Sequence, residues 1–221
     1  MGENKINNYS LCYENLCAEF HKYHPEEMAR RSGAYYDSEK QQLTLTYFNR
    51  EYLILYPKGT VTLKEDVQEN FSKGDNRKII DKTVILSYLY RCTKSNLTNK
   101  WVPFRELEGV GHAYDGFALQ GINRLVKFFG NKGDLFLKAG LKLGGKEFTS
   151  GDVGLEIKVL PNVPMAFILW LADEEFEAEA AILYDYSATK ELHVEDLAGL
   201  CSMAADELIG AAKKILEIGE L

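Results

Sequence analysis

The sequence predicts an α+β fold, in which antiparallel sheets of meander and hairpin strands are packed with about five helices. Two observations carry this prediction. Alternating segments follow one another directly, first over 43–63 and again over 155–184, so neighbouring strands are expected to pair antiparallel. Helical periodicity gathers before, between and after these two groups, whereas a parallel-sheet enzyme would alternate one strand with one helix.

The N-terminal part begins with helical patterns and continues as a β-meander. Apolar residues recur at helical spacing over 9–23, and Pro25 with two acids behind it restarts a helix that Gly33 ends. Alternating segments then predict three strands joined by turns, over 43–47, 52–56 and 61–63. A largely apolar helix is expected over 79–91.

The C-terminal part contains the best-specified unit of the chain, a hairpin around an apolar run. The run over 163–171 is apolar on both faces, which is typical of a central strand. Leucines and alanines form one stripe over 194–216 and predict the clearest helix. The full order expected here is an extended segment, two helices, three strands and a final helix, over 101–107, 117–129, 134–143, 155–159, 163–171, 180–184 and 194–216.

A chain of 221 residues holds either one domain over 1–221 or two lobes, over about 1–108 and 109–221. Hydrophobic residues make up 46% and charged residues 27%, which is typical of a globular protein. The formal net charge is −7, and the chain has no block rich in Lys and Arg. Binding to nucleic acid or to an anionic membrane is therefore not expected, because both need a basic face. A partner protein with a basic patch fits better.

The N-terminus and the cysteines indicate a cytoplasmic protein. Residues 1–10 are polar and show no secretory signal. The longest apolar run is shorter than the roughly 20 residues of a membrane span. No CxxC pair occurs, so a disulfide framework is not expected among Cys12, Cys17, Cys92 and Cys201.

The turn after the central strand is the first candidate site. Five carboxylates fall within seven residues, beside Trp170 and Phe176; they are Asp173, Glu174, Glu175, Glu177 and Glu179. If the turn holds Asp173 or Glu175 in partial burial, the pKa of that carboxyl would rise. Three interpretations stay open: a solvated turn whose charges prevent edge aggregation, a surface for a partner or ligand, and acid–base catalysis.

The glycine-rich loop over 109–116 is the second candidate site. His112, Tyr114 and Asp115 are available there for proton transfer or ligand contacts. The glycines lack the spacing of a phosphate loop. The alternative is that they form tight turns whose polar residues face water.

Three residues near the N-terminus are a weak candidate for a metal site. Cys17, His21 and His24 lie at positions i, i+4 and i+7, so on one continuous helix they would share a face. Three nitrogen and sulfur ligands suit zinc. Pro25 follows directly, and the alternative is a core cysteine with two rim histidines.

The chain resembles the domain of unknown function 3786 over about 10–210. Motifs mostly structural in character carry the resemblance; they are Phe104-Arg-Glu-Leu107, Gly109, Tyr114, Phe117, Phe129-Gly130, Leu160-Pro-Asn-Val-Pro164, Trp170, Asp173-Glu-Glu-Phe176, Ile182-Leu-Tyr-Asp185, Ser187-Ala188, Leu192 and Glu195-Asp-Leu197. Members often have Pro where this chain has Glu177 or Ala178.

The resemblance implies a role in anaerobic metabolism, since the family occurs mainly in anaerobic bacteria and archaea. Some members are joined to a cysteine-rich iron–sulfur module of the kind seen in corrinoid iron–sulfur proteins. The family offers no catalytic residues to carry over.

Together, the residues and the resemblance favour a cytoplasmic binding or accessory protein. Its ligand would be a tetrapyrrole-like or corrinoid-like molecule, or its partner a redox protein or corrinoid iron–sulfur protein. The expected binding residues are His112, Tyr114, Asp115, Trp170, Asp173 and Glu175. The alternative is a hydrolase- or transferase-type enzyme that uses the acids at 173–175 together with His112.

Overall fold

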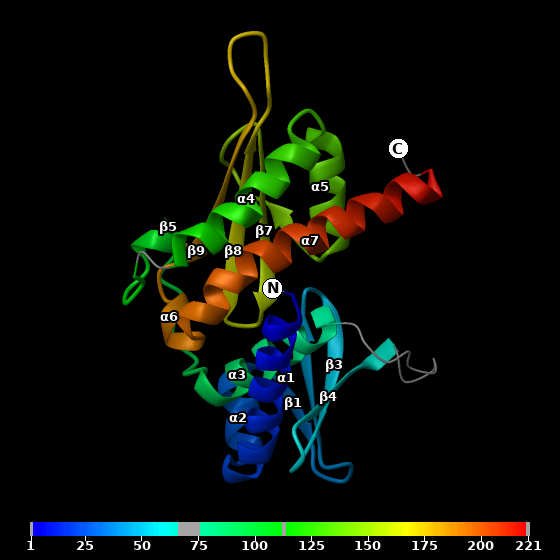
Figure 1. Cartoon of the computed structure of the whole chain (residues 1–221), viewed down its shortest axis with the longest axis vertical. Helices are drawn as coiled ribbons and strands as arrows, with labels where there is room; N and C mark the ends of the chain where they lie inside the picture. Colours follow the sequence, from blue (N-terminus) through cyan, green and yellow to red (C-terminus); the bar gives the residue numbers. More distant parts are fainter. Residues whose placement is uncertain (1, 66–75, 112–113, 220–221) are drawn as a thin grey trace. The chain divides into compact units, whose positions relative to one another are not determined.

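The computed structural model describes residues 2–65, 76–111 and 114–219 (Figure 1). Contacts divide the chain into two compact units, an N-terminal unit (Met1–Ser95 with Lys190–His193) and a C-terminal unit (Asn96–Thr189 with Val194–Leu221). The described residues form seven α-helices and two antiparallel sheets, of four and five strands. The α+β prediction is confirmed, and the number of domains stays a prediction.

The N-terminal unit contains one sheet with strand order β1-β2-β3-β4 and the helices around it. Its elements are α1 (Gly2–Glu19), the 3₁₀ turn η1 (Phe20–Lys22), α2 (Pro25–Ser32), β1 (Tyr35–Asp37), β2 (Gln42–Tyr47), β3 (Arg50–Leu55), β4 (Thr60–Leu63) and α3 (Asn76–Arg91).

Alternation along the strands builds the core of this unit. One face of the sheet is buried, because the apolar positions of β2, β3 and β4 point the same way; they are Leu43, Leu45, Tyr47, Tyr52, Ile54 and Val61. On α3, Tyr88 is fully buried and donates its hydroxyl to the carbonyl of Ser32 at 2.8 Å, which ties α3 to the end of α2.

Helix α1 is held to the turn between β3 and β4 by polar contacts. The Tyr13 hydroxyl accepts the N–H of Val61 at 3.0 Å, and the thiol of Cys17 donates to the carbonyl of Gly59 at 3.4 Å. Gly59 has a φ of 67°, and a Cβ there would lie 3.1 Å from Phe20. The turn therefore needs glycine both for its backbone conformation and for its close contact with α1.

The C-terminal unit contains the second sheet, with strand order β5-β9-β8-β7-β6. Its elements are β5 (Trp101–Pro103), the 3₁₀ turn η3 (Phe104–Glu106), α4 (Asp115–Phe129), α5 (Gly133–Lys142), β6 (Lys146–Glu147), β7 (Val153–Leu160), β8 (Val163–Trp170), β9 (Glu179–Asp185) and α7 (Val194–Ile218), while α6 (Ala188–Glu191) crosses the division between the units.

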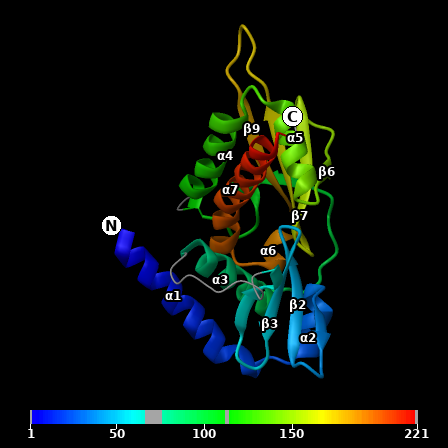
Figure 2. The ribbon, with the colours of Figure 1, turned by 90° about the vertical axis from the view of Figure 1, so that its right-hand side faces the viewer.

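Strand β8 is the centre of this unit and is buried along 163–169. Helices α4, α5 and α7 cover one face of its sheet (Figures 1 and 2). On the other face the segment after β6 approaches the sheet, with Phe148 against Trp101 and Gly151 against Ile168. The central strand predicted over 163–171 is thus confirmed.

The structure differs from the expected elements in a few places. Strand β1 was not predicted from the sequence, and the extended segment expected over 101–107 is a short strand followed by a 3₁₀ turn. Within the described residues, no helix combines the length and the apolar character that crossing a membrane requires.

Helices α4 and α7 approach each other closely at Gly121. A Cβ at this position would lie 2.3 Å from the carbonyl oxygen of Cys201, which is backbone and cannot rotate away. Gly210 lies within α7, and a Cβ there would meet no atom within 4 Å. The two glycines therefore differ in what they contribute to packing.

We expect Gly121→Ala to destabilise the protein by about 2–3 kcal/mol, because overpacking forces the two helices apart. Gly210→Ala serves as the matched control and should stabilise by about 0.5–1 kcal/mol through helix propensity. Denaturant unfolding followed by circular dichroism measures both. Equal stability of the two variants would contradict the close contact.

Candidate functional site

The C-terminal unit contains a pocket of about 360 Å³ between β9, α4, α7 and the turn η3. Almost all of the residues around it are apolar. The lining consists of Pro103, Phe104, Arg105, Ala118, Leu119, Ile122, Ala180, Ala181, Ile182 and Cys201. Five elements, β5, η3, α4, β9 and α7, thus line one apolar space, and we name it the β9–α4 pocket.

Cys201 supplies a neutral thiol to this pocket. Its side chain is 1% exposed, and burial raises the pKa of the thiol to about 12. The Tyr184 hydroxyl donates its one proton to the carbonyl of Leu197 at 2.6 Å, so in the 3.2 Å contact between Tyr184 Oη and Cys201 Sγ the thiol is the donor. A protonated thiol is a poor nucleophile and a poor metal ligand.

The acidic turn does not hold a buried carboxylate. Asp173 is exposed and accepts the N–H groups of Glu175 at 2.8 Å and Phe176 at 2.7 Å, which lowers the pKa of its carboxyl. The prediction that Asp173 has a raised pKa is therefore wrong, because the side chain caps its own turn instead of entering the core. The side chain of Glu175 is also exposed.

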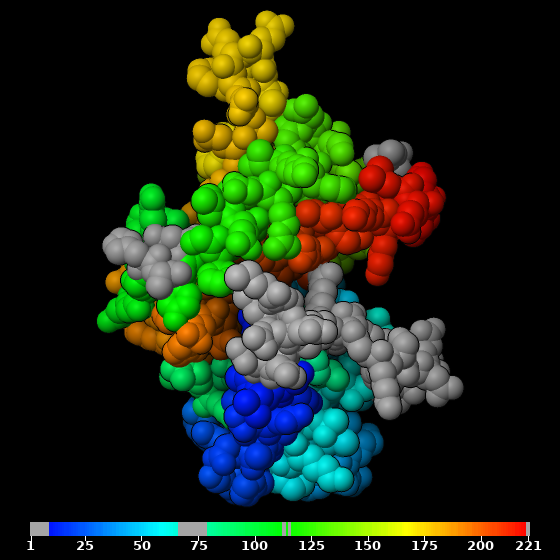
Figure 3. All heavy atoms as spheres, viewed as in Figure 1, coloured from blue at the N-terminus to red at the C-terminus, as the bar shows by residue number. Residues whose placement is uncertain are grey.

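The tip of the β8–β9 hairpin presents two aromatic rings among its carboxylates. Trp170 is 39% exposed and stands opposite Glu179 on β9, and Phe176 is 70% exposed. The space-filling view shows this tip, in gold, projecting beyond the helices of the C-terminal unit (Figure 3). The sequence-predicted residues Trp170, Asp173 and Glu175 therefore belong to one exposed surface.

The glycine-rich loop is described only in part. His112 lies outside the described residues, and so does the side chain of Asp115. Tyr114 precedes α4 and donates its hydroxyl to Glu195 Oε1 at 2.6 Å, and this hydrogen bond raises the pKa of the tyrosine. Tyr114 thus joins the first turn of α7 to the beginning of α4.

The two predicted groups of site residues lie at opposite ends of α4. Tyr114 precedes its first residue, whereas the N–H of Ala172, at the base of the hairpin, donates to the carbonyl of Gly130 just after its last. Fifteen helical residues separate these points by about 22 Å. The structure therefore does not bring the acids at 173–175 to the glycine-rich loop.

The three residues of the metal candidate do not share a helix face. Helix α1 ends at Glu19, and His24 follows as an extended residue whose Nδ1 lies 2.7 Å from Glu26 Oε2. The thiol of Cys17 donates to a carbonyl, and burial raises its pKa. Among the described residues, no group of three or more His, Cys, Asp or Glu side chains is arranged to hold a metal ion.

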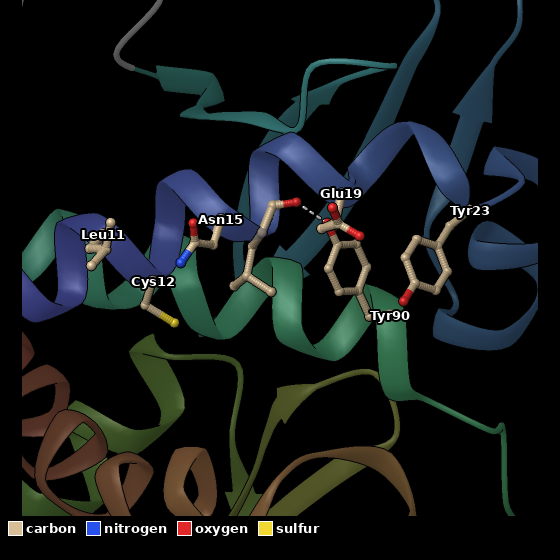
Figure 4. Close-up of a pocket in the computed structure, with 7 residues that line it drawn as sticks. Leu11, Cys12, Asn15, Glu19, Tyr23 and Tyr90 are labelled. Atoms are coloured by element: carbon tan, nitrogen blue, oxygen red, sulfur yellow. Dashed lines mark hydrogen bonds between the residues drawn. The ribbon is translucent and has the colours of Figure 1, made fainter.

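The N-terminal unit has an open pocket of about 520 Å³ along α1 and α3 (Figure 4). The Tyr23 and Tyr90 rings stack beside it, with centroids 4.4 Å apart, and Tyr90 donates its hydroxyl to the carbonyl of Leu16. The lining mixes apolar and polar side chains, from Leu11, Cys12, Asn15, Leu16, Glu19, Tyr23 and Tyr90. Its shape offers less enclosure than that of the β9–α4 pocket.

Two buried carboxylates hold the segment between α3 and β5. Glu191 accepts the hydroxyl and N–H of Ser95, at 2.6 and 2.8 Å, and the hydroxyl of Thr93 at 2.9 Å. Asp185 accepts both the N–H and the hydroxyl of Thr98 and of Ser187, at 2.6–3.0 Å. Each carboxylate thus replaces the strand or helix partners that this segment lacks.

Neither these carboxylates nor the residues that line the β9–α4 pocket were predicted from the sequence. The lining of the pocket includes the small residues Ala118 of α4 and Ala180 of β9, which are 62 positions apart in sequence and come together only after folding. The sequence did contain one signal for Asp185. An aspartate at the end of a strand often accepts a hydrogen bond from the backbone two residues on, and Ser187 stands at that position.

Comparison with known proteins gives one match. The family model described as "Domain of unknown function (DUF3786)" matches residues 24–207. No curated protein and no solved structure matches the chain.

Asp185 should make the unfolding free energy of the protein depend on pH in the acid range. Burial by itself would raise the pKa of this carboxyl, but the hydrogen bonds from Ser187 and Thr98 outweigh it and lower the pKa. A lowered native pKa stabilises the fold above the unfolded value of about 3.9, and the stabilisation is lost as the pH falls through the native value.

We expect Asp185→Asn to lower the unfolding free energy at pH 7 by about 2 kcal/mol, because buried donors lose an ionised acceptor. The variant should also show a smaller stability loss than wild type between pH 5 and about pH 2. Unfolding curves across this range measure both effects, with Glu174→Gln as the exposed control. If Asp185→Asn loses as much stability as wild type when the pH falls, groups other than Asp185 produce the pH dependence.

Proposed function

The chain belongs to the family of the domain of unknown function DUF3786, and from that premise we propose that it is a binding or accessory protein whose ligand occupies the β9–α4 pocket. The observation that supports this proposal most directly is the partly open apolar space between a sheet and its covering helices. Such places are where small-molecule sites commonly occur, with volumes of about 300–1,000 Å³.

The walls of the pocket support a preformed site. The η3 side is fixed because β5 pairs with β9 and Phe104 is buried against Tyr184, with ring centroids 6.3 Å apart. The α4 side is fixed by the contact between Gly121 and Cys201. A preformed apolar pocket loses little conformational entropy when a ligand enters it.

The proposed ligand is smaller than a tetrapyrrole or a corrinoid. The pocket lies near the lower end of the usual range of volumes. No histidine is among the described residues that line it, and the thiol of Cys201 stays protonated, so this described lining offers haem iron no good axial ligand. These observations favour a compact aliphatic or aromatic molecule.

Filling the pocket should abolish binding. Ala180 lies on β9 and lines the pocket, whereas Ala172 is exposed at the base of the hairpin and does not line it. We expect wild type and Ala172→Phe to bind the neutral dye N-phenyl-1-naphthylamine with equal affinity. Ala180→Phe should weaken binding at least about tenfold, equivalent to about 1.4 kcal/mol. Fluorescence titration measures the affinities, and circular dichroism checks the fold of each variant.

The proposal fails if Ala180→Phe binds the dye as wild type does, or if Ala172→Phe loses binding equally. Absorbance titrations with haem and cobalamin test the limit on ligand size. A saturable spectral change that Ala180→Phe removes would show that the pocket accepts the larger rings after all.

The hairpin tip favours a second candidate function, docking of a partner protein. Phe176 is exposed on the projecting tip and Trp170 is exposed on β8 where the tip begins, and aromatic residues are enriched where proteins bind each other. The carboxylates around them suit a partner with a basic patch, including a redox protein or a corrinoid iron–sulfur protein.

If the tip docks a partner, the double variant Trp170→Ser/Phe176→Ser should lose at least about 2 kcal/mol of binding energy. Pull-down from a lysate of the native host, followed by titration of the captured protein, measures the loss. The exposed pair Tyr35→Ser/Leu55→Ser on the first sheet is the control. Capture that is unchanged in the double variant, or insensitive to salt, argues against docking at the tip.

A further inference from the structure

We infer that the ligand of the β9–α4 pocket joins an apolar body to an anionic head group, which Arg105 receives at the rim. This inference rests on the proposed function and narrows the ligand to a class. Carboxylate and phosphate share the chemistry that a guanidinium recognises, because both accept two parallel hydrogen bonds.

Arg105 is the one charged residue among the described residues that line this pocket. The other lining residues offer hydrocarbon, aromatic ring or the neutral thiol of Cys201. A ligand that fills the pocket therefore meets apolar walls along most of its length and a single positive group at Arg105. An ammonium group at that position would be repelled, and a neutral polar group would gain less than an anion.

The backbone that carries Arg105 is firmly placed. Strand β5 pairs with β9 through Val102 opposite Tyr184 and Pro103 opposite Leu183. Phe104 is 3% exposed, and the next residue, Arg105, is exposed. The guanidinium thus stands on a rigid turn with its stem beside the apolar lining, an arrangement that long cationic side chains commonly adopt.

Arg105 has no acidic partner among the residues that the structure describes. It forms no ion pair and no side-chain hydrogen bond with any residue that the structure describes. By contrast, Arg124 on α4 is paired with Asp206 at 2.6 Å. The arginine at the pocket is therefore available to an incoming anion, although the whole chain carries a net charge of −7.

The experiment compares ligands that share an eight-carbon chain and differ in head group. Octanoate, octyl phosphate, 1-octanol and octylammonium each displace N-phenyl-1-naphthylamine from wild type, Arg105→Gln, Arg105→Lys and Lys127→Gln. Lys127 is exposed on α4 outside the pocket, so its variant removes the same charge without touching the lining.

We expect Arg105→Gln to reduce the affinity for an anionic ligand about fivefold relative to 1-octanol, as one exposed ion pair is worth up to about 1 kcal/mol. Lys127→Gln should leave this ratio unchanged. Arg105→Lys should lose part of it, because lysine keeps the positive charge but cannot form the two parallel hydrogen bonds of the guanidinium. Octanoate and octyl phosphate are tested separately. The ligand that loses more affinity in Arg105→Gln identifies the preferred head group, carboxylate or phosphate. Octylammonium should bind most weakly to wild type.

The two proposals fail in distinguishable ways. In one outcome, Ala180→Phe removes dye binding but Arg105→Gln leaves the affinity for octanoate and octyl phosphate relative to 1-octanol unchanged. This outcome overturns the proposal of an anionic head group and supports the proposal of a pocket. If the relative affinity for the anionic ligands falls as much in Lys127→Gln as in Arg105→Gln, it reflects the net charge of the protein, and the role of Arg105 is overturned. Absence of dye binding to wild type overturns both.

Discussion

The contact between α4 and α7 at Gly121 determines the geometry of the C-terminal unit. A backbone carbonyl occupies the place where any other residue would put its Cβ, so the two helices pack at backbone distance. Cys201 supplies that carbonyl and also lines the β9–α4 pocket, while Ala118 and Ile122 line it from the neighbouring positions of α4. The depth of the pocket thus follows from one interhelical distance. Anything that moves α4 away from α7 changes the shape of the pocket.

Strand β8 is the second constraint, because it is buried on both faces and pairs with β7 and β9 over its whole length. The pairing of β8 with β9 determines which side chains of β9 face the helices and where the strand ends and the hairpin tip begins. Residues 180–182 line the pocket, and Glu179 pairs with Trp170 where the tip begins. A rigid hairpin therefore carries an enclosed apolar site and an exposed aromatic surface on consecutive residues.

Much of the fold could be predicted from the sequence, because its signals are local. The stripe of α7, the doubly apolar run of β8 and the Pro25-to-Gly33 limits of α2 depend on neighbours within a few turns of chain. The candidate sites were predicted less well. The i, i+4, i+7 spacing of Cys17, His21 and His24 assumes a helix that in fact ends at Glu19.

The errors at the sites have a common physical reason. One interpretation placed Asp173 or Glu175 in partial burial because both follow an apolar strand, but the carboxylate of Asp173 binds two backbone N–H groups of its own turn. The β9–α4 pocket is built by five elements, and no short segment of sequence encodes it. Functional features of this chain depend on long-range packing, which composition and spacing do not reveal.

The buried carboxylate of Glu191 links the completion of the N-terminal unit to the order in which the chain is synthesised. It belongs to the N-terminal unit, yet about 90 residues of the C-terminal unit separate it in sequence from Thr93 and Ser95, whose hydroxyls it accepts. A polypeptide that stops after Ser95 would carry these donors without their acceptor. The N-terminal unit is therefore completed only late in synthesis, after most of the C-terminal unit has left the ribosome. Separating the two units experimentally requires residues 190–193 to be joined to the first 95 by a new connection, since neither a single cut nor a circular permutation makes these two segments contiguous.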